Sequence, residues 1–260
     1  MVEINRIYNE DCLEGMKGIS DSSIDCIICD LPYGTTICKW DVIIPFDALW
    51  KQYNRIIKDD GAIVLFSKEP FTSLLICSNL GDFKYRWNWI KDTKSNFMQA
   101  NYQPLNNVED ICVFSKAYAR EIKGKTKIKY NPQYTIGEPY NIPKASSTTS
   151  IFSSNHKNGK YEHKDRDTSK RYPFITLNFN VDRDRIHPTQ KPIDLIRYLV
   201  RTYSNEGDLV LDNCMGSGTT AIASIIENRN YIGFESNEEY FNMANERIDA
   251  FIGKMKESLW

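Results

Sequence analysis

A short run, Asp30-Leu31-Pro32-Tyr33-Gly34, has the residue types that could hold and stack on a flat heterocycle bearing an amino group. It directly follows the apolar segment 24–29, and ligands in parallel sheets bind at the carboxyl ends of strands. An aspartate there can accept hydrogen bonds from the amino group, while an aromatic ring stacks on the heterocycle. The same residues also suit a tight turn, because proline and glycine favour turns. Both interpretations remain open for the run taken alone.

A glycine-containing segment is the second candidate for chemistry. It follows an apolar strand, precedes an apolar helical stripe, and reads Asp212-Asn213-Cys214-Met215-Gly216-Ser217-Gly218-Thr219-Thr220. Glycines let the backbone approach a ligand closely, and a helix N-terminus favours negative groups. The segment lacks the lysine of a phosphate-binding P-loop, which argues against triphosphate hydrolysis. A simple turn would explain Gly-x-Gly equally well.

Glu235 gives the glycine segment a partner. It ends the next apolar strand, roughly 20 residues after the glycines, where an acid accepts hydrogen bonds from both ribose hydroxyls. A surface glutamate is the alternative, because Glu238 and Glu239 follow. The loop and the acid together favour an adenosine-type ligand.

A regular alternation of strands and helices must position these residues. Apolar runs predict strands at 4–8, 24–29, 62–66, 85–91, 109–115, 208–211 and 231–234. Apolar stripes predict helices at 45–58, at 70–79, after Pro192, after Gly218 and at 240–251, and Asp59-Asp60-Gly61 is interpreted as a helix stop. The alternation predicts an α/β fold with a doubly wound, mostly parallel sheet.

Residues 116–185 differ from both flanks, since they lack periodicity and look rich in loops. They carry 15 Lys or Arg against 7 Asp or Glu, although the net charge of the chain is −1. We therefore predict three parts: 1–115, an insert at 116–185, and 186–260. A basic segment on an acidic body suits a phosphate-bearing polymer, and a solvated flexible surface is the alternative.

The seven cysteines are scattered, which indicates a reducing compartment rather than a disulfide framework. Cys26-x-x-Cys29 lies in a predicted strand, where the two thiols would point to opposite faces, so we expect no metal site. No apolar run is long enough to cross a bilayer and no apolar signal core begins the chain. We expect a cytoplasmic protein without a membrane partner.

Several motifs, in one order, resemble the beta group of amino-DNA methyltransferases, the circularly permuted class that methylates adenine N6 or cytosine N4. Asp30-Leu31-Pro32-Tyr33 is similar to that family's Asp-Pro-Pro-Tyr signature. The segment His187-Pro188-Thr189-Gln190-Lys191-Pro192 and the strand and loop at 207–220 resemble its cofactor region. Segments 9–13 and 108–114 resemble its acidic turn and the strand that closes its catalytic half. The matches cover both α/β parts and leave 116–185 unmatched.

This resemblance implies a permuted class I methyltransferase fold that uses S-adenosylmethionine, with 116–185 as a target-recognition insert that binds DNA. The residues it implies for catalysis are Asp30, Leu31, Pro32 and Tyr33. Those it implies for the cofactor are Asp11, Cys12, Thr189, Lys191, Asp212, Cys214, Gly216, Ser217, Gly218, Thr219, Thr220 and Glu235. The permuted order also places the last strand beside the first.

The implied reaction is methyl transfer to the amino group of a base turned out of the duplex. The Asp30 carboxylate and the Leu31 carbonyl would accept its N–H groups, and Tyr33 would stack on the ring. Thr189, Lys191, Asp212 and the loop would hold the methionine end, Glu235 the ribose and Asp11 the adenine.

Two departures from the family pattern matter. Leu31 replaces a proline, and we expect this change to be tolerated because leucine keeps the backbone carbonyl that the proline contributes. Asn213-Cys214 replaces Pro-Phe, and we expect this change to weaken cofactor binding. By resemblance alone, Asp30 favours adenine N6 over cytosine N4.

Cytosine-N4 methylation, an RNA or protein-amide methyltransferase, and a catalytically idle DNA-binding module are the alternatives. The intact Asp30, Tyr33, Gly216, Gly218 and Glu235 argue against an idle module. The resemblance also implies a homodimer, while roles in restriction–modification, regulation or phage protection stay open.

Overall fold

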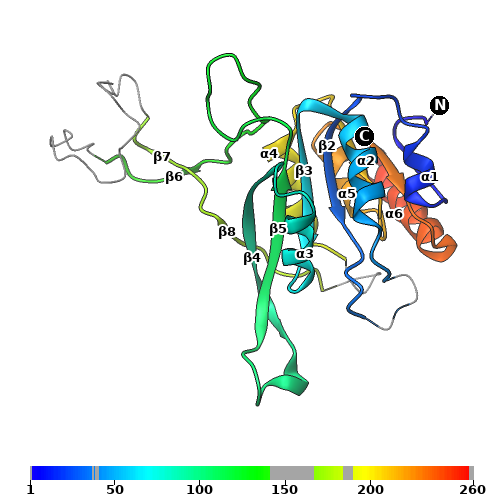
Figure 1. Cartoon of the computed structure of the whole chain (residues 1–260), viewed down its shortest axis with the longest axis horizontal. Coiled ribbons are helices and arrows are strands. Elements are labelled where there is room, and N and C mark those ends of the chain that lie inside the picture. Colours follow the sequence, from blue (N-terminus) through cyan, green and yellow to red (C-terminus); the bar gives the residue numbers. More distant parts are fainter. Residues whose placement is uncertain (1, 37, 39–40, 141–166, 184–189, 258–260) are drawn as a thin grey trace. The chain divides into compact units, whose positions relative to one another are not determined.

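The computed structural model describes residues 2–36, 38, 41–140, 167–183 and 190–257 (Figure 1). Two compact units are present: unit 1 comprises Met1–Asn131 and Ile175–Trp260, and unit 2 comprises Pro132–Phe174. Thr189 lies outside the described residues, so its predicted contact with a cofactor stays a prediction.

Unit 1 is built on a sheet of eight strands, counted over its described residues. In spatial order these are β1 (Arg6–Tyr8), β10 (Asn230–Phe234), β9 (Leu209–Asp212), β2 (Ile24–Asp30), β3 (Ile57–Ser67), β5 (Asn106–Phe114), β4 (Phe83–Ser95) and β8 (Thr176–Asn178). Strand β5 runs antiparallel to β3 and β4, and the other neighbouring pairs are parallel. The predicted mostly parallel sheet is confirmed.

Helices cover both faces of this sheet. One face packs against α1 (Cys12–Met16), α2 (Phe46–Ile56) and α3 (Phe71–Ser78), and the other against α4 (Ile193–Tyr203), α5 (Thr219–Ile226) and α6 (Glu238–Glu257). The side chains of β2 alternate, so Cys29 belongs to the first core and Cys26 to the second. The two thiols therefore point to opposite faces, as predicted.

The boundary between α2 and β3 differs from the prediction. Helix α2 ends at Ile56 and β3 begins at Ile57, so Asp59-Asp60-Gly61 lies inside a strand and is not a helix stop. The ladder with β2 shifts register here, between Ile24 and Cys26. A Cβ on Gly61 would lie 2.9 Å from the Asp25 carbonyl oxygen, so glycine permits this close approach.

The strand order places a topological switch between β9 and β2. Strands β10 and β1 extend the sheet on the β9 side, and Tyr8 of β1 pairs with Phe234 of β10, as the permuted order predicts. Strand β3 extends it on the other side, while Ile27 of β2 pairs with Leu211 of β9. Where the strand order reverses in this way, the connections leave the two neighbouring strands in opposite directions. A crevice then forms at the carboxyl ends of these strands.

The second unit, Pro132–Phe174, covers only the middle of the segment 116–185. Its strands β6 (Thr135–Ile136) and β7 (Lys170–Arg171) form a short antiparallel ribbon. Residues on both sides of it belong to unit 1, where Ala117, Ile128 and Leu177 are buried in the core of the α4 face. These buried residues lie in loops and in a three-residue strand, where apolar residues have no regular spacing. Sequence periodicity therefore did not predict their burial. None of the described helices is long and apolar enough to span a membrane.

Candidate active site

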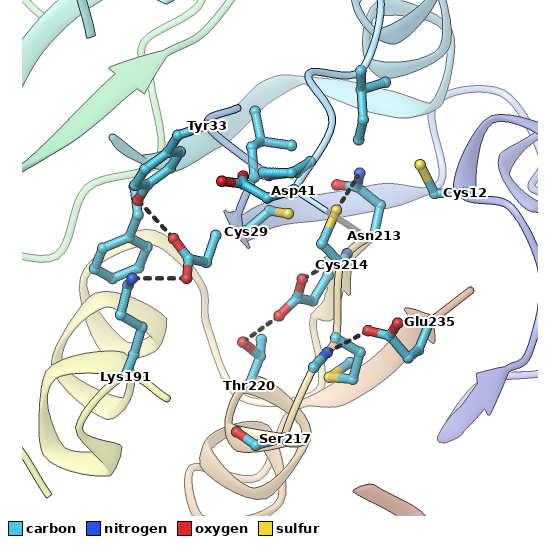
Figure 2. A pocket seen from close by; sticks show the side chains of 18 of the residues that line it. Cys12, Cys29, Tyr33, Asp41, Lys191, Asn213, Cys214, Ser217, Thr220 and Glu235 are labelled. Atoms are coloured by element: carbon cyan, nitrogen blue, oxygen red, sulfur yellow. Dashed lines mark hydrogen bonds and ion pairs between the residues drawn. The ribbon is translucent and has the colours of Figure 1, made fainter. Parts of the chain in front are cut away.

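A cavity of about 600 Å³ opens at the carboxyl ends of β2 and β9 (Figure 2). Its walls bring together most of the site residues that sequence analysis singled out. These are Asp11, Cys12, Asp30, Leu31, Pro32, Tyr33, Lys191, Asp212, Cys214, Gly216, Ser217, Thr219, Thr220 and Glu235. Gly218 does not line the cavity. It precedes α5 with φ +76°, and a Cβ there would lie 3.3 Å from the Ala244 Cβ, so it serves the turn and its packing on α6.

Asp30 lies at the centre of a buried group of charges. Its Oδ2 accepts a hydrogen bond from Lys191 Nζ at 2.7 Å, and its Oδ1 accepts one from the Tyr33 hydroxyl at 2.7 Å. Lys191 Nζ also lies 2.8 Å from Glu109 Oε1, and the Tyr33 hydroxyl lies 3.0 Å from the same oxygen. Lys91 pairs with the other oxygen of Glu109. We call these five residues the Asp30 cluster.

Burial and ion pairing act against each other in this cluster. Burial raises the pKa of the Asp30 carboxyl, and the Lys191 ammonium only partly offsets that rise. Burial acts on Glu109 too, but the ammonium groups of Lys191 and Lys91 lower its pKa to about 2. Asp30 is therefore the carboxylate of the cluster that can more readily accept a proton.

A turn held by Asp41 shapes the wall beside Tyr33. The Asp41 carboxylate accepts hydrogen bonds from the backbone N–H groups of Gly34, Thr35 and Thr36, at 2.7 to 2.9 Å. Although burial opposes the shift, these donors lower the pKa of Asp41. The Tyr33 ring stacks on Phe71, with centroids 5.1 Å apart and 27° between planes. One face of the ring is thus fixed by packing.

The glycine segment forms the other end of the cavity around Asp212. The Asp212 carboxylate accepts hydrogen bonds from Thr220 Oγ1 at 2.6 Å and from the Cys214 N–H at 3.1 Å. Burial raises the pKa of this carboxyl to about 6. Glu235 accepts hydrogen bonds from the Gly216 N–H at 2.8 Å and the Asn237 N–H at 2.9 Å, and burial raises its pKa as well.

Asp11 and the thiols of Cys12 and Cys214 also line the cavity. Asp11 caps α1, accepting hydrogen bonds from the N–H groups of Leu13 and Glu14 at 2.8 and 3.2 Å. A hydrogen bond with Cys214 and burial together raise the pKa of the Cys12 thiol, so this thiol is neutral. The cavity therefore offers carboxylates and uncharged thiols side by side.

Comparison with known proteins places this site in a family. Residues 24–246 match the family model N6_N4_Mtase, described as DNA methylase. The chain belongs to this DNA methylase family. A relative, the type II methyltransferase M1.MboII of Moraxella bovis, is 31% identical over 94% of this chain and 96% of its own. The DNA adenine methyltransferase YhdJ of Escherichia coli (strain K12) is 27% identical over 95% of this chain and 84% of its own.

Two solved structures share the fold of this methylase. The M1.HpyAVI-SAM complex has 24% identity and a TM-score of 0.59, covering 93% of this chain and 98% of its own. The cytosine-N4-specific PvuII DNA methyltransferase has 16% identity and a TM-score of 0.66, covering 94% and 86%.

Lys191 of the methylase forms ion pairs within the cavity: its ammonium group contacts Asp30 and Glu109. Its assignment to the methionine end of the cofactor stays a prediction. The Lys191 side chain is only 10% exposed. A buried ammonium is stable only beside anions, and two carboxylates lie within hydrogen-bond distance here.

Three residues of the site were missed by sequence analysis: Asp41, Lys91 and Glu109. Glu109 had a usable signal, because an acid inside an apolar strand has to find a buried partner. Lys91 and Asp41 had none, since their partners are distant in sequence or are backbone groups of a folded turn.

Proposed function

We propose that this methylase transfers a methyl group from S-adenosylmethionine to adenine N6 of a base turned out of duplex DNA. The observation that carries the proposal is the common cavity, into which Asp30 of the signature and Asp212 and Glu235 of the glycine-loop side all open. Membership of the DNA methylase family supports the reaction, and the adenine methyltransferase among its relatives supports the base.

The charge of the cavity fits this cofactor. Six carboxylates line it, those of Asp11, Asp30, Asp41, Glu109, Asp212 and Glu235, against the two ammonium groups of Lys91 and Lys191. S-adenosylmethionine carries a sulfonium and an ammonium group, which the excess of negative charge attracts. Asp212 and the glycine loop would hold the methionine end, Glu235 the ribose and Asp11 the adenine. When bound, the cofactor supplies an electrophilic methyl group. A structural neighbour in complex with SAM supports the same cofactor here.

The other end of the cavity suits the target amine. Its nitrogen lone pair is delocalised into the base, so the amine needs acceptors that favour a tetrahedral nitrogen. Asp30 and the Leu31 carbonyl would accept its two N–H groups, while the cavity-lining Tyr33 stacks on the base. Lys191 now occupies Asp30 Oδ2, so the amine would replace it there while Lys191 stays on Glu109.

Proton release follows from the same contacts. As the nitrogen–methyl bond forms and the sulfur–methyl bond breaks, the nitrogen becomes cationic and must lose one proton. Asp30 would take that proton and pass it to water, because burial raises its pKa. Glu109, with a pKa of about 2, is a poor acceptor.

Replacing Asp30 tests the assignment. We expect Asp30→Ala to lower methyl transfer to DNA by at least about a hundredfold, because it removes a preorganised acceptor. Binding of S-adenosylmethionine, measured by calorimetry, should persist. Asp249→Ala, an exposed position on α6, is the matched control. Methylation by Asp30→Ala at near the wild-type rate would contradict the proposal.

Cytosine N4 is the second candidate target, favoured by one observation, the likeness to the cytosine-N4-specific PvuII enzyme. Expression in a host without DNA methylation, followed by sequencing that detects modified bases, separates the two. N6-methyladenine at one sequence supports the proposal, and N4-methylcytosine replaces it. The same experiment gives the target sequence.

A further inference from the structure

Strands β4 and β5 continue beyond the sheet as a long hairpin. Strand β4 runs in the same direction as β2 and β3, so it points past the edge where Asp30 lies. Figure 1 shows the hairpin extending well past the neighbouring strands on that side. The β4–β5 ladder reaches Ser95 opposite Asn106, and a 3-10 turn, η1 (Phe97–Gln99), lies at the tip.

The base of this hairpin is part of the Asp30 cluster. Lys91 lies on β4 and Glu109 on β5, and Glu109 touches the Tyr33 hydroxyl. Phe97 follows Lys91 by six residues. At a strand rise of about 3.3 Å per residue, the tip reaches up to about 20 Å beyond the cluster. The tip therefore extends on the side of the sheet where the cavity opens.

The tip has a defined conformation. The Gln99 N–H donates to the Asn96 carbonyl and the Tyr102 N–H donates to the Gln99 carbonyl, both at 2.9 Å. Ser95 Oγ donates to the Asn106 carbonyl at 3.0 Å across the two strands. Asn96 adopts φ +70°, which asparagine tolerates better than most residues. These contacts fix the backbone of the tip.

Apolar side chains crowd the tip although water surrounds it. Phe97 is 67% exposed, Met98 98% and Tyr102 91%. Residues 93–108 include no aspartate or glutamate and one basic residue, Lys94. They also include six amides, at Asn96, Gln99, Asn101, Gln103, Asn106 and Asn107. Exposed apolar groups of this kind mark binding surfaces.

We propose that the hairpin tip inserts into the DNA base stack beside the target nucleotide and fills the space that the base leaves. The inference rests on the proposed function. Phe and Met are side chains that wedge between base steps, an aromatic ring stacks on any base, and amides read base edges. Absence of acidic residues in 93–108 suits a polyanion. Three apolar side chains are few for a stable dimer interface, which makes a second copy the weaker occupant.

The test compares intact DNA with DNA in which the target base has no partner. The variant is Phe97→Ala, Met98→Ala and Tyr102→Ala together, and Leu80→Ala, at a residue 67% exposed outside the hairpin, is the matched control. The substrates are a duplex oligonucleotide of the mapped target sequence and the same duplex with an abasic site opposite the target. We expect kcat/KM to fall at least about tenfold on the intact duplex, because the extrusion cost is no longer offset, and less than about threefold on the abasic duplex.

Two further readings make the result decisive. Calorimetric binding of S-adenosylmethionine should be unchanged in the variant, which shows that the fold and the cofactor site persist. A photoreactive p-benzoylphenylalanine at position 97 should cross-link to the duplex. Equal activity of variant and wild type on the intact duplex would overturn the inference. It would also be overturned if the only effect of the triple variant were to dissociate a dimer. If wild type methylates neither duplex, the proposed function fails, and absence of the cross-link then overturns the inference as well.

Discussion

At the scale of single residues, the Asp30 cluster balances two carboxylates against two ammonium groups in a buried place. Lys191 is the residue of the cluster on which the substrate-free arrangement most depends, because it bridges Asp30 and Glu109. Its hydrogen bond to Asp30 occupies the position that a target amine would take. Lys191 lowers the pKa of Asp30, although burial raises it overall, and we expect Lys191 to hold this carboxylate until a substrate amine replaces it.

Lys191→Met should separate these roles. Without the ammonium, burial raises the pKa of Asp30 further, so the acidic limb of the pH–rate profile moves to higher pH. Loss of one partner of a buried ion pair should also lower the free energy of unfolding by about 3 kcal/mol. Methyl-transfer rates from pH 5 to 9 and urea unfolding measure both. An unshifted profile, with the exposed Lys254→Met as control, would contradict the role.

The cofactor end should respond to pH through Asp212. Its pKa of about 6 in the folded chain means that Asp212 is protonated at pH 5 and ionised at pH 7.5. A cationic cofactor binds the ionised form better, so affinity should rise between these values, by up to about tenfold. Calorimetry at both pH values checks this. In Asp212→Asn only the dependence due to Glu235, whose pKa is also raised, should remain.

At the scale of elements, the site depends on β2 and β9 being neighbours, and an ion cluster at their opposite ends holds them together. Lys129 Nζ lies 3.0 Å from Asp25 Oδ1 and 2.7 Å from Asp208 Oδ2. Asp25 is the second residue of β2, and Asp208 directly precedes β9. The Leu209 N–H also donates to Asp25 at 3.0 Å. These contacts join the amino ends of the two strands, at the edge opposite the cavity.

Lys129→Met should therefore affect stability and leave binding intact. Asp25 keeps Lys58 as a partner, so we expect a loss of about 2 kcal/mol, below the usual range for a broken buried pair. Urea unfolding measures the loss, and calorimetry with S-adenosylmethionine should show an unchanged Kd. The exposed Lys125→Met should change neither. A weakened Kd in Lys129→Met would show that the cluster is coupled to the site.

At the scale of the whole molecule, the basic charge predicted for the insert is divided. Residues 116–131 belong to unit 1, where Lys116 lies against Asp59 and Lys129 against Asp25, at the amino ends of β2 and β3. That edge is opposite the cavity. Lys116 and Lys129 thus pair with acids of the sheet, and target recognition by 116–185 stays a prediction.

Salt dependence of DNA binding should reflect this division. Each lost phosphate contact lowers the slope of log K against log salt by about 0.9. We expect Lys123→Ala, Lys125→Ala and Lys127→Ala together to leave the slope unchanged, although all three are exposed. Lys94→Ala, on the hairpin, should lower it by about one contact. A lower slope in the triple variant would place DNA on the opposite edge.

The local sequence was sufficient for much of this molecule. Apolar runs, glycine turns and the residues that end strands determine which side chains stand at the carboxyl edge, because these features depend on neighbours in the chain. The order of the motifs was enough to predict that β1 pairs with β10.

Tertiary structure alone decided which charges meet. Lys191 reaches Asp30 across 161 positions of the chain, and Lys129 reaches Asp25 across 104. Such pairs depend on strand register and burial, which residue spacing does not encode. The number of charged residues in 116–185 likewise does not say where they lie in space. Only the folded chain shows that some of them lie at the edge of the sheet away from Asp30.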